Sequence, residues 1–151
     1  MTRRLQTAYR ASVLWGLCSF LLTPVVQAES PRYNYVTHCM GCHGPHGEGV
    51  AGKIPALNQS LPAFARTVEG RAFAVSVPGA SNSNLSDADL TDVMNWLLTQ
   101  LNADHQSRGL GVFTVAEVSG SRKPVLSKVR EARAALLKSL AQSGPVPPDE
   151  Y

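Results

Sequence analysis

The stretch T-H-C-M-G-C-H-G-P-H-G, residues 37–47, places two cysteines and three histidines within eleven positions. Cys39 and Cys42 are separated by two residues, and His43 follows directly. Two cysteines at this spacing lie close together on one turn of chain. That arrangement suits a redox disulfide, half of a zinc site, or two thioether bonds to the vinyl groups of a haem.

The position of His43 favours the haem. Once both cysteines are bonded to a haem, an imidazole one residue further on lies beneath the iron as an axial ligand, and C-x-x-C-H is the attachment motif of c-type haem. A structural zinc site needs four protein ligands, and the remaining histidines show no second paired spacing. A thioredoxin-like site would need a βαβ pattern, and none is visible. We therefore expect one covalent haem c on Cys39 and Cys42, with His43 as the proximal iron ligand.

The first 28 residues have the pattern of a secretory signal. Three arginines precede an uncharged apolar run over 11–23, and the small residue Ala28 ends a cleavage motif. The run of about 13 residues is shorter than the roughly 20 that a spanning helix needs, so an uncleaved anchor is the weaker alternative. We expect a periplasmic or otherwise exported chain that begins near Glu29 and has no membrane span after cleavage.

Helical patterns are visible on both sides of the cysteine motif. Ser30 can cap a first helix that begins at Pro31. The segment L-S-D-A-D-L-T-D-V-M-N-W-L-L-T-Q-L predicts a helix over about 87–101, capped by Ser86 with Asp89 in a capping box. Residues at helical spacing give this helix one apolar face: Leu90, Val93, Leu97 and Leu101.

Together these features resemble a small class I cytochrome c over residues 31–101. H-G-P-H-G-E-G-V-A-G-K-I-P-A-L is similar to the glycine-rich haem loop of that family, and Pro55 stands where a proline carbonyl accepts the other N–H of the proximal histidine. In the family the terminal helix crosses the first one, so we expect Trp96 to pack on Tyr35. The resemblance implies an all-α haem domain of three to four helices, with 70–77 as a short middle helix ended by the following Pro-Gly.

The second axial ligand of the iron is the point at which the chain departs from the family. Class I cytochromes usually supply a methionine from the loop before the terminal helix, but V-P-G-A-S-N-S-N contains neither Met nor His. Met94 in the terminal helix and His105 after it remain candidates, although a methionine such as Met94 is more often core filler. The leading interpretation is water or an empty position, which would admit a small exogenous ligand.

Residues 105–141 form an extension beyond the resemblance. Thr114 and Glu117 form a capping box for a short helix that Gly120 would stop. A second helix, amphipathic, is predicted over 124–141 and begins with a proline. Its apolar face consists of Val125, Val129, Ala132, Leu136, Leu137 and Leu140. We expect this face to pack on the chain's own haem domain and stabilise it, or to dock an electron-transfer partner.

Charge separates the haem domain from the extension. Residues 29–104 contain four basic and seven acidic side chains, whereas residues 105–140 contain seven basic and two acidic ones, so the two parts should attract. Without residues 1–28 the chain has eleven of each sign, which favours neither nucleic acid nor a membrane surface as partner. The predicted organisation is a signal peptide 1–28, a cytochrome c haem domain 29–104, a helical extension 105–141 and a disordered tail 142–151.

The predicted function is that of a periplasmic monohaem electron carrier and not of an enzyme. It would take single electrons from a dehydrogenase and deliver them to an oxidase or reductase. Two alternatives stay open: a haem protein whose open sixth position binds a small exogenous ligand, and a haem subunit of a larger oxidoreductase complex. The ligand-binding alternative would use the iron differently from an electron carrier. Six-coordinate iron with two strong ligands passes electrons and admits no further ligand, whereas an open sixth position admits one.

Overall fold

The computed structural model describes residues 29–101 and 109–148, and within these ranges the chain is all-α, with one isolated bridge between Val50 and Ile54 and no strand. The predicted fold class is therefore confirmed at this level. The elements are α2 (Pro31–His38), α3 (Met40–His43), α4 (Leu57–Phe64), α5 (Val68–Ser76), α6 (Pro78–Ser81), α7 (Asp87–Trp96), the π-helical η1 (Leu97–Leu101), α8 (Val115–Ser121) and α9 (Val129–Leu140). The proposed signal segment lies outside the described residues.

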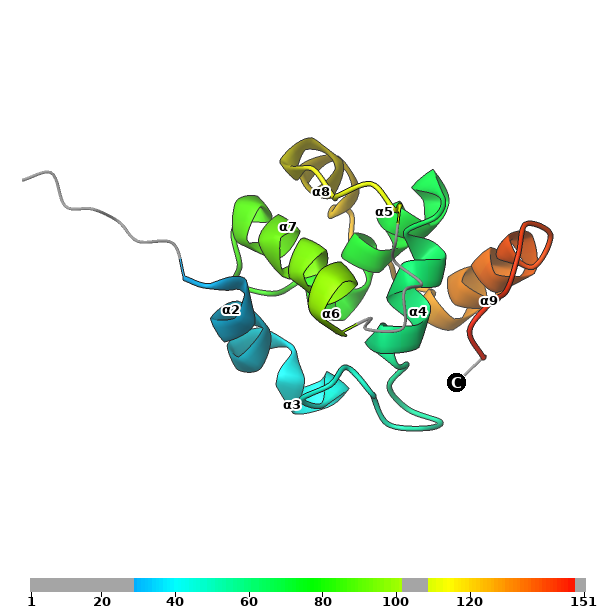
Figure 1. Ribbon diagram of the computed structural model, residues 1–151. Helices are drawn as coiled ribbons and strands as arrows, with labels where there is room; N and C mark the ends of the chain where they lie inside the picture. The colour runs from blue at the N-terminus through cyan, green and yellow to red at the C-terminus, as the bar shows by residue number, and fades with distance from the viewer. Residues whose placement is uncertain (1–28, 102–108, 149–151) are drawn as a thin grey trace, which may run out of the picture.

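The helices surround α7. Helix α2 packs against α7, α4 packs against α5 and η1, and α8 covers α5 and α7. Figure 1 shows α9 on the outer side of α4 and α5, away from α2 and α3. None of the helices in the part of the chain that the structure describes is long and apolar enough to cross a bilayer.

The predicted starts of the first and terminal helices are confirmed. The Ser30 hydroxyl accepts a hydrogen bond from the N–H of Tyr33 at 3.2 Å, and Ser86 accepts one from Asp89 at 3.0 Å. The Asp89 carboxylate accepts from the Ser86 hydroxyl at 2.6 Å and not from the Ser86 backbone N–H, so only one half of the predicted capping box forms. Beyond Trp96 the helix continues with the wider π-helical turn of η1; the side chain of Leu101 lies outside the description.

The middle of the chain differs from its prediction. Helix α5 begins at Val68, two residues early, because the Thr67 hydroxyl accepts from the N–H of Gly70 at 3.1 Å. Pro78 does not only end a helix but begins the single turn of α6. Helix α4 was not predicted at all: no side chain caps its start, and Pro62 inside it removes a backbone donor.

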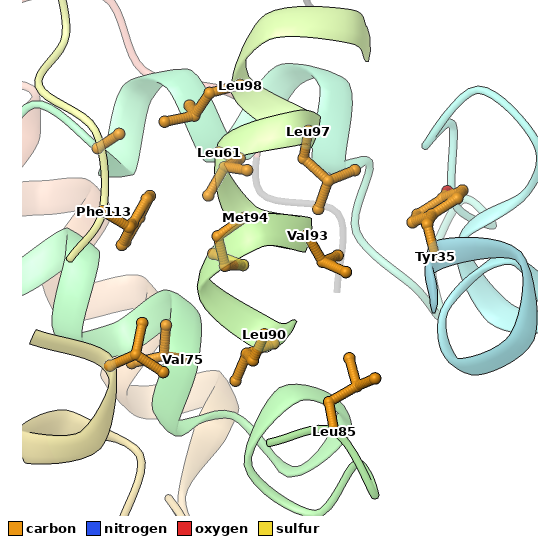
Figure 2. Packing of buried hydrophobic residues seen from close by; sticks show 12 residues of the cluster. Tyr35, Leu61, Val75, Leu85, Leu90, Val93, Met94, Leu97, Leu98 and Phe113 are labelled. Atoms are coloured by element: carbon orange, nitrogen blue, oxygen red, sulfur yellow. The ribbon is translucent and has the colours of Figure 1, made fainter. Parts of the chain in front are cut away.

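The core forms where α2 crosses α7. Tyr35 is 1% exposed, and its ring centroid lies 5.3 Å from that of Trp96 with a tilt of 41°, so the predicted contact is confirmed. Figure 2 shows Val93 of α7 and Leu97 of η1 pointing toward Tyr35. The cluster of buried residues around this crossing comprises Tyr35, Leu61, Ala65, Val75, Leu85, Leu90, Val93, Met94, Leu97, Leu98, Phe113 and Val118.

The predicted extension packs on the helices that precede it. Helix α8 has both halves of the predicted Thr114–Glu117 capping box, but it continues through Gly120 to Ser121, so the predicted stop is wrong. Glu117 also accepts two hydrogen bonds from Arg71 of α5, at 2.6 and 2.9 Å. That guanidinium lies 4.0 Å from the ring centroid of Phe113, which adds a cation–π contact.

Helix α9 is shorter than predicted. It begins at Val129 and not at residue 124, because the preceding segment is extended and the N–H of Leu126 donates to the carbonyl of Ser76 at 2.9 Å. Its apolar face packs on α4 and α5 in a second cluster, which comprises Ala63, Phe64, Phe73, Leu136, Leu137 and Leu140. We expected this face either to pack on the chain itself or to dock a partner, and in the structure it packs on the chain's own helices.

The Arg71–Glu117 pair predicts a pH dependence of stability. Hydrogen bonding from Arg71 lowers the pKa of Glu117 from 4.5 to about 2. A carboxyl group whose pKa is lower in the folded state stabilises that state above its unfolded pKa, and this contribution is lost as the pH falls toward 2. Because Glu117 is 40% exposed, we expect only about 1 kcal/mol from it.

Unfolding in urea at pH 7 and pH 3 measures this contribution. Glu117→Gln should lower the free energy of unfolding at pH 7 and make it fall less between the two pH values. Glu131→Gln changes the same position in the first turn of α9 and is the matched control. Equal pH dependence in the two variants would contradict the assignment.

Candidate functional site

The two cysteines and His43 come together on one turn of chain. Helix α2 ends at His38, and the single turn of α3 follows Cys39. The N–H groups of Cys42 and His43 both donate to the carbonyl of Cys39, at 3.1 and 3.0 Å. Cys39 is half-buried, Cys42 is exposed, and neither forms a disulfide. The motif thus places both sulfurs and the imidazole at one side of α3, as a single attachment site requires.

These residues lie on the wall of a cavity of about 420 Å³. Most of the wall is apolar. The last residue of α2, helices α3 to α7, η1 and α9 contribute residues to it, whereas no residue of α8 lines it. The lining includes the motif residues Cys39, Cys42 and His43, and the surrounding apolar side chains Ile54, Leu57, Leu61, Phe64, Phe73, Val77, Leu90, Val93, Met94 and Leu97. A cavity of this kind suits a large apolar ligand with few polar groups.

His43 is held in a defined orientation. Its Nδ1 lies 3.2 Å from the carbonyl oxygen of Pro55, so the predicted contact is present. A carbonyl only accepts, which means that Nδ1 carries the proton and Nε2 keeps its lone pair for a metal. Burial lowers the pKa of His43, and the hydrogen bond to Pro55 partly opposes this. The imidazole therefore stays neutral near pH 7, the form that ligates iron.

The glycine-rich loop brings Pro55 to His43. The N–H of Gly49 donates to the carbonyl of His43 at 2.9 Å, and Val50 and Ile54 exchange hydrogen bonds at 2.8 Å. Gly49 has a φ of 66°, and a Cβ there would collide with the carbonyls of Ile54 and Pro55. A glycine is required for the loop to close this tightly.

Tyr35 connects the helix crossing to this loop, a role that its sequence position did not reveal. Its hydroxyl donates to the carbonyl of Gly44 at 2.5 Å. Burial, and to a smaller extent Cys39 and Glu48, raises the pKa of Tyr35 to about 12, so it remains a donor. Burial also raises the pKa of Cys39 to about 11, with Cys42 adding to it. Cys39 is then a thiol at neutral pH, which disfavours the reactive dithiol of a redox disulfide.

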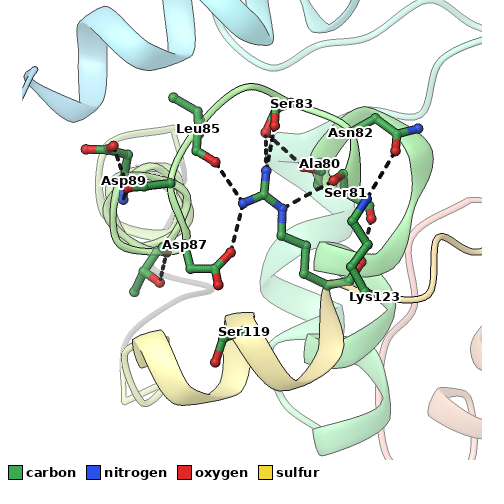
Figure 3. Close-up of polar contacts among 12 residues, drawn as sticks. Ala80, Ser81, Asn82, Ser83, Leu85, Asp87, Asp89, Ser119 and Lys123 are labelled. Carbon is green, nitrogen blue, oxygen red and sulfur yellow. Dashed lines mark hydrogen bonds and ion pairs between the residues drawn. The ribbon is translucent and has the colours of Figure 1, made fainter.

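The segment between α5 and α7, in which the sequence contains neither Met nor His, also lines the cavity. Pro78, Gly79, Ala80 and Ser83 contribute to the wall, and none of them offers a strong iron ligand. Arg122 from the end of α8 holds this segment from outside the cavity. Figure 3 shows polar atoms of Ser83, Leu85 and Asp87 directed at one guanidinium.

The contacts of Arg122 are numerous for a side chain that is 8% exposed. Its Nη1 donates to the Leu85 carbonyl and the Asp87 carboxylate, both at 2.8 Å, and its Nη2 donates to the Ser83 carbonyl at 2.6 Å. The Ser81 hydroxyl donates back to the Arg122 carbonyl. The sequence contained no signal for this network, because its members lie about 40 residues apart.

The structure separates the candidates for the second axial ligand. Met94 is 5% exposed and lines the cavity, although it is also part of the core cluster. His105 lies outside the described residues. His38 lines the cavity from an exposed position, whereas His46 is exposed and does not line it. Met94 is thus the candidate that the structure brings to the cavity together with His43.

Three polar residues of the wall were not predicted: Ser60, Arg130 and Arg133. Arg133 is 2% exposed, and its Nη2 donates to the Ser60 hydroxyl at 3.1 Å. The two arginines are three residues apart and so share a face of α9, a pattern that is visible in the sequence but does not reveal what the face covers.

Within residues 29–101 and 109–148, no three His, Cys, Asp or Glu side chains gather in a way that could hold a metal ion. Scans of the chain against protein-family models, curated proteins and solved structures found no match.

The Arg122 network predicts a large effect of its removal on stability. Arg122→Gln would leave buried carbonyls without donors, and we expect it to lower the free energy of unfolding by about 2–3 kcal/mol. Its neighbour Lys123, exposed and in a 3.4 Å contact with Asn82, is the matched control. Lys123→Gln should change the free energy by less than about 0.5 kcal/mol. Urea unfolding measures both, and equal effects would contradict the role of Arg122.

Proposed function

We propose that the chain is an exported monohaem c-type cytochrome that carries single electrons between redox proteins. The observation that carries this proposal is the position of Cys39, Cys42 and His43 together on the wall of an apolar cavity, with His43 oriented by Pro55. The fold would be that of a class I cytochrome c over α2 to η1, which the confirmed Tyr35–Trp96 contact supports.

The residues that line the cavity fit a covalently bound haem. Each thiol, of Cys39 and Cys42, would add across one vinyl double bond, with sulfur bonding to one carbon and hydrogen to the other, so that no external oxidant is needed. His43 would ligate the iron through Nε2, and the Pro55 carbonyl would keep the ring basic and in place. The bound haem supplies one-electron ferric–ferrous chemistry. The apolar wall of the cavity would exclude water from the haem. The haem edge next to the exposed Cys42 would approach redox partners.

Covalent attachment is the first testable consequence. The exported chain, produced in a host with haem-ligation machinery, should exceed its polypeptide mass by one haem. The double variant Cys39→Ser/Cys42→Ser should show no added mass, because no thiol remains. His43→Ala should keep the added mass but change the Soret spectrum, whereas His46→Ala, at an exposed position away from the cavity, should change neither. A wild-type chain at its bare polypeptide mass would refute the proposal.

A second candidate function has one observation in its favour. The wall segment of Pro78, Gly79, Ala80 and Ser83 contains no strong ligand, so the sixth position would be open unless Met94 or His105 occupies it. An open position would make the protein a binder of a small exogenous ligand. The wall there offers no acid or base for efficient peroxide cleavage, so binding is favoured over catalysis.

Carbon monoxide distinguishes the two functions. If Met94 ligates the iron, adding carbon monoxide to the dithionite-reduced protein should leave the Soret band unchanged, and Met94→Leu should make it shift rapidly. Met40→Leu, next to Cys39 on the motif side, is the matched control and should behave as wild type. A rapid shift in the wild-type protein would instead support the ligand-binding function.

A further inference from the structure

The charged side chains among the described residues of the cavity wall are of one sign. Within residues 29–101 and 109–148, the wall includes Arg130 and Arg133 and no Asp or Glu. The other titratable groups of the wall are His38, Cys39, Cys42 and His43. An apolar cavity with two arginines and no carboxylate suits an amphipathic ligand whose polar end is anionic.

The arginines and the cysteines belong to different parts of the cavity wall. The cysteines belong to α3 and its start, next to α2, whereas both arginines belong to α9, which packs on α5. In Figure 1, α3 and α9 lie on different sides of α4. A haem carries its vinyl groups and its two propionates on opposite edges of the ring. A haem bonded through Cys39 and Cys42 would have its carboxylates on the side of the ring away from these cysteines, where the arginines of α9 could bind them.

Arg133 has the environment of a binding residue. Its side chain is 2% exposed, its guanidinium lies 5.2 Å from the ring centroid of Phe64, and its Nη2 donates to Ser60, which also lines the cavity. Arg130 lies one turn earlier on the same face of α9 and is exposed, so it stands at the mouth of the cavity. The guanidinium of Arg133 is thus held in place before any ligand arrives, which reduces the entropy that binding would cost.

We propose that Arg133 and Arg130 of the C-terminal extension bind the propionate carboxylates of the haem, so that α9 is part of the cofactor site. This inference rests on the proposed function, because it assumes the haem on Cys39 and Cys42. Ser60 orients Arg133 and is the third polar group of the subsite. The net positive charge of residues 105–140 is then placed where the cofactor is negative.

The experiment uses the full-length holoprotein and measures its added mass and its midpoint reduction potential between pH 5 and pH 9. Removing a positive charge near the iron disfavours the ferrous form, so Arg133→Gln should lower the potential. It should also move the inflection in the plot of potential against pH upward by about one unit or more, because an unpaired propionate has a higher pKa. Arg133→Lys keeps the charge, so its potential and its inflection should lie between those of the wild-type protein and those of Arg133→Gln.

Arg71→Gln is the matched control, because it removes an arginine that holds the extension but does not line the cavity. It should reduce thermal stability and leave the potential and the inflection at wild-type values. Should Arg133→Gln fail to accumulate, Arg130→Gln, at an exposed position, is measured in the same two ways and should show the same shifts.

The outcomes separate the two proposals. If the wild-type chain has no added haem mass, both the proposed function and this inference are wrong. If the mass is present and the arginine variants keep the wild-type potential and inflection, the propionates bind elsewhere and only this inference is wrong. Shifts of the same size in Arg71→Gln would also overturn it, since they would then follow from loosening the extension.

Discussion

The crossing of α2 on α7 determines where every other part of the site can lie. Tyr35 is buried at this crossing against Trp96, and its hydroxyl donates to the carbonyl of Gly44 at the start of the glycine-rich loop. Because α3 follows α2 almost directly, the crossing also sets the position of the cysteine motif relative to Val93 of α7 and Leu97 of η1, which line the same cavity. An aromatic pair of this kind contributes about 0.5–1.5 kcal/mol beyond the area it buries.

The cavity at the centre of so small a chain has a physical consequence under the proposed function. A small domain buries a smaller fraction of its surface on folding than a large one does, and here part of the interior is a hollow lined by residues such as Leu61 and Phe64. An apolar group bonded inside it would complete the core and stabilise the folded state over the unfolded one. Folding and cofactor attachment would then be coupled.

The extension contacts the helices that precede it at three places. Arg71 of α5 binds Glu117 of α8, Arg122 at the end of α8 holds the segment before α7, and the apolar face of α9 packs on Phe64 and Phe73. Two of these contacts use buried or half-buried arginines with several acceptors each, which strengthens the individual hydrogen bonds. The extension thereby supports the cavity wall from outside and contributes Arg133 to it.

Local patterns in the sequence were enough to identify the cysteine motif, the caps at Ser30 and Ser86, and the apolar face of the terminal helix. Each of these features depends on residues within one or two helical turns. The His43–Pro55 contact and the Tyr35–Trp96 contact were also predictable, but only through a family resemblance.

What only the tertiary structure decided depends on residues far apart in the chain. Helix α4 forms without a cap and despite Pro62, since burial of its apolar side compensates for a weak local preference. The start of α9 is delayed by a hydrogen bond between Leu126 and Ser76. Likewise, no local pattern shows that Arg133 faces the same cavity as His43, because ninety residues separate them and helix packing alone brings them together.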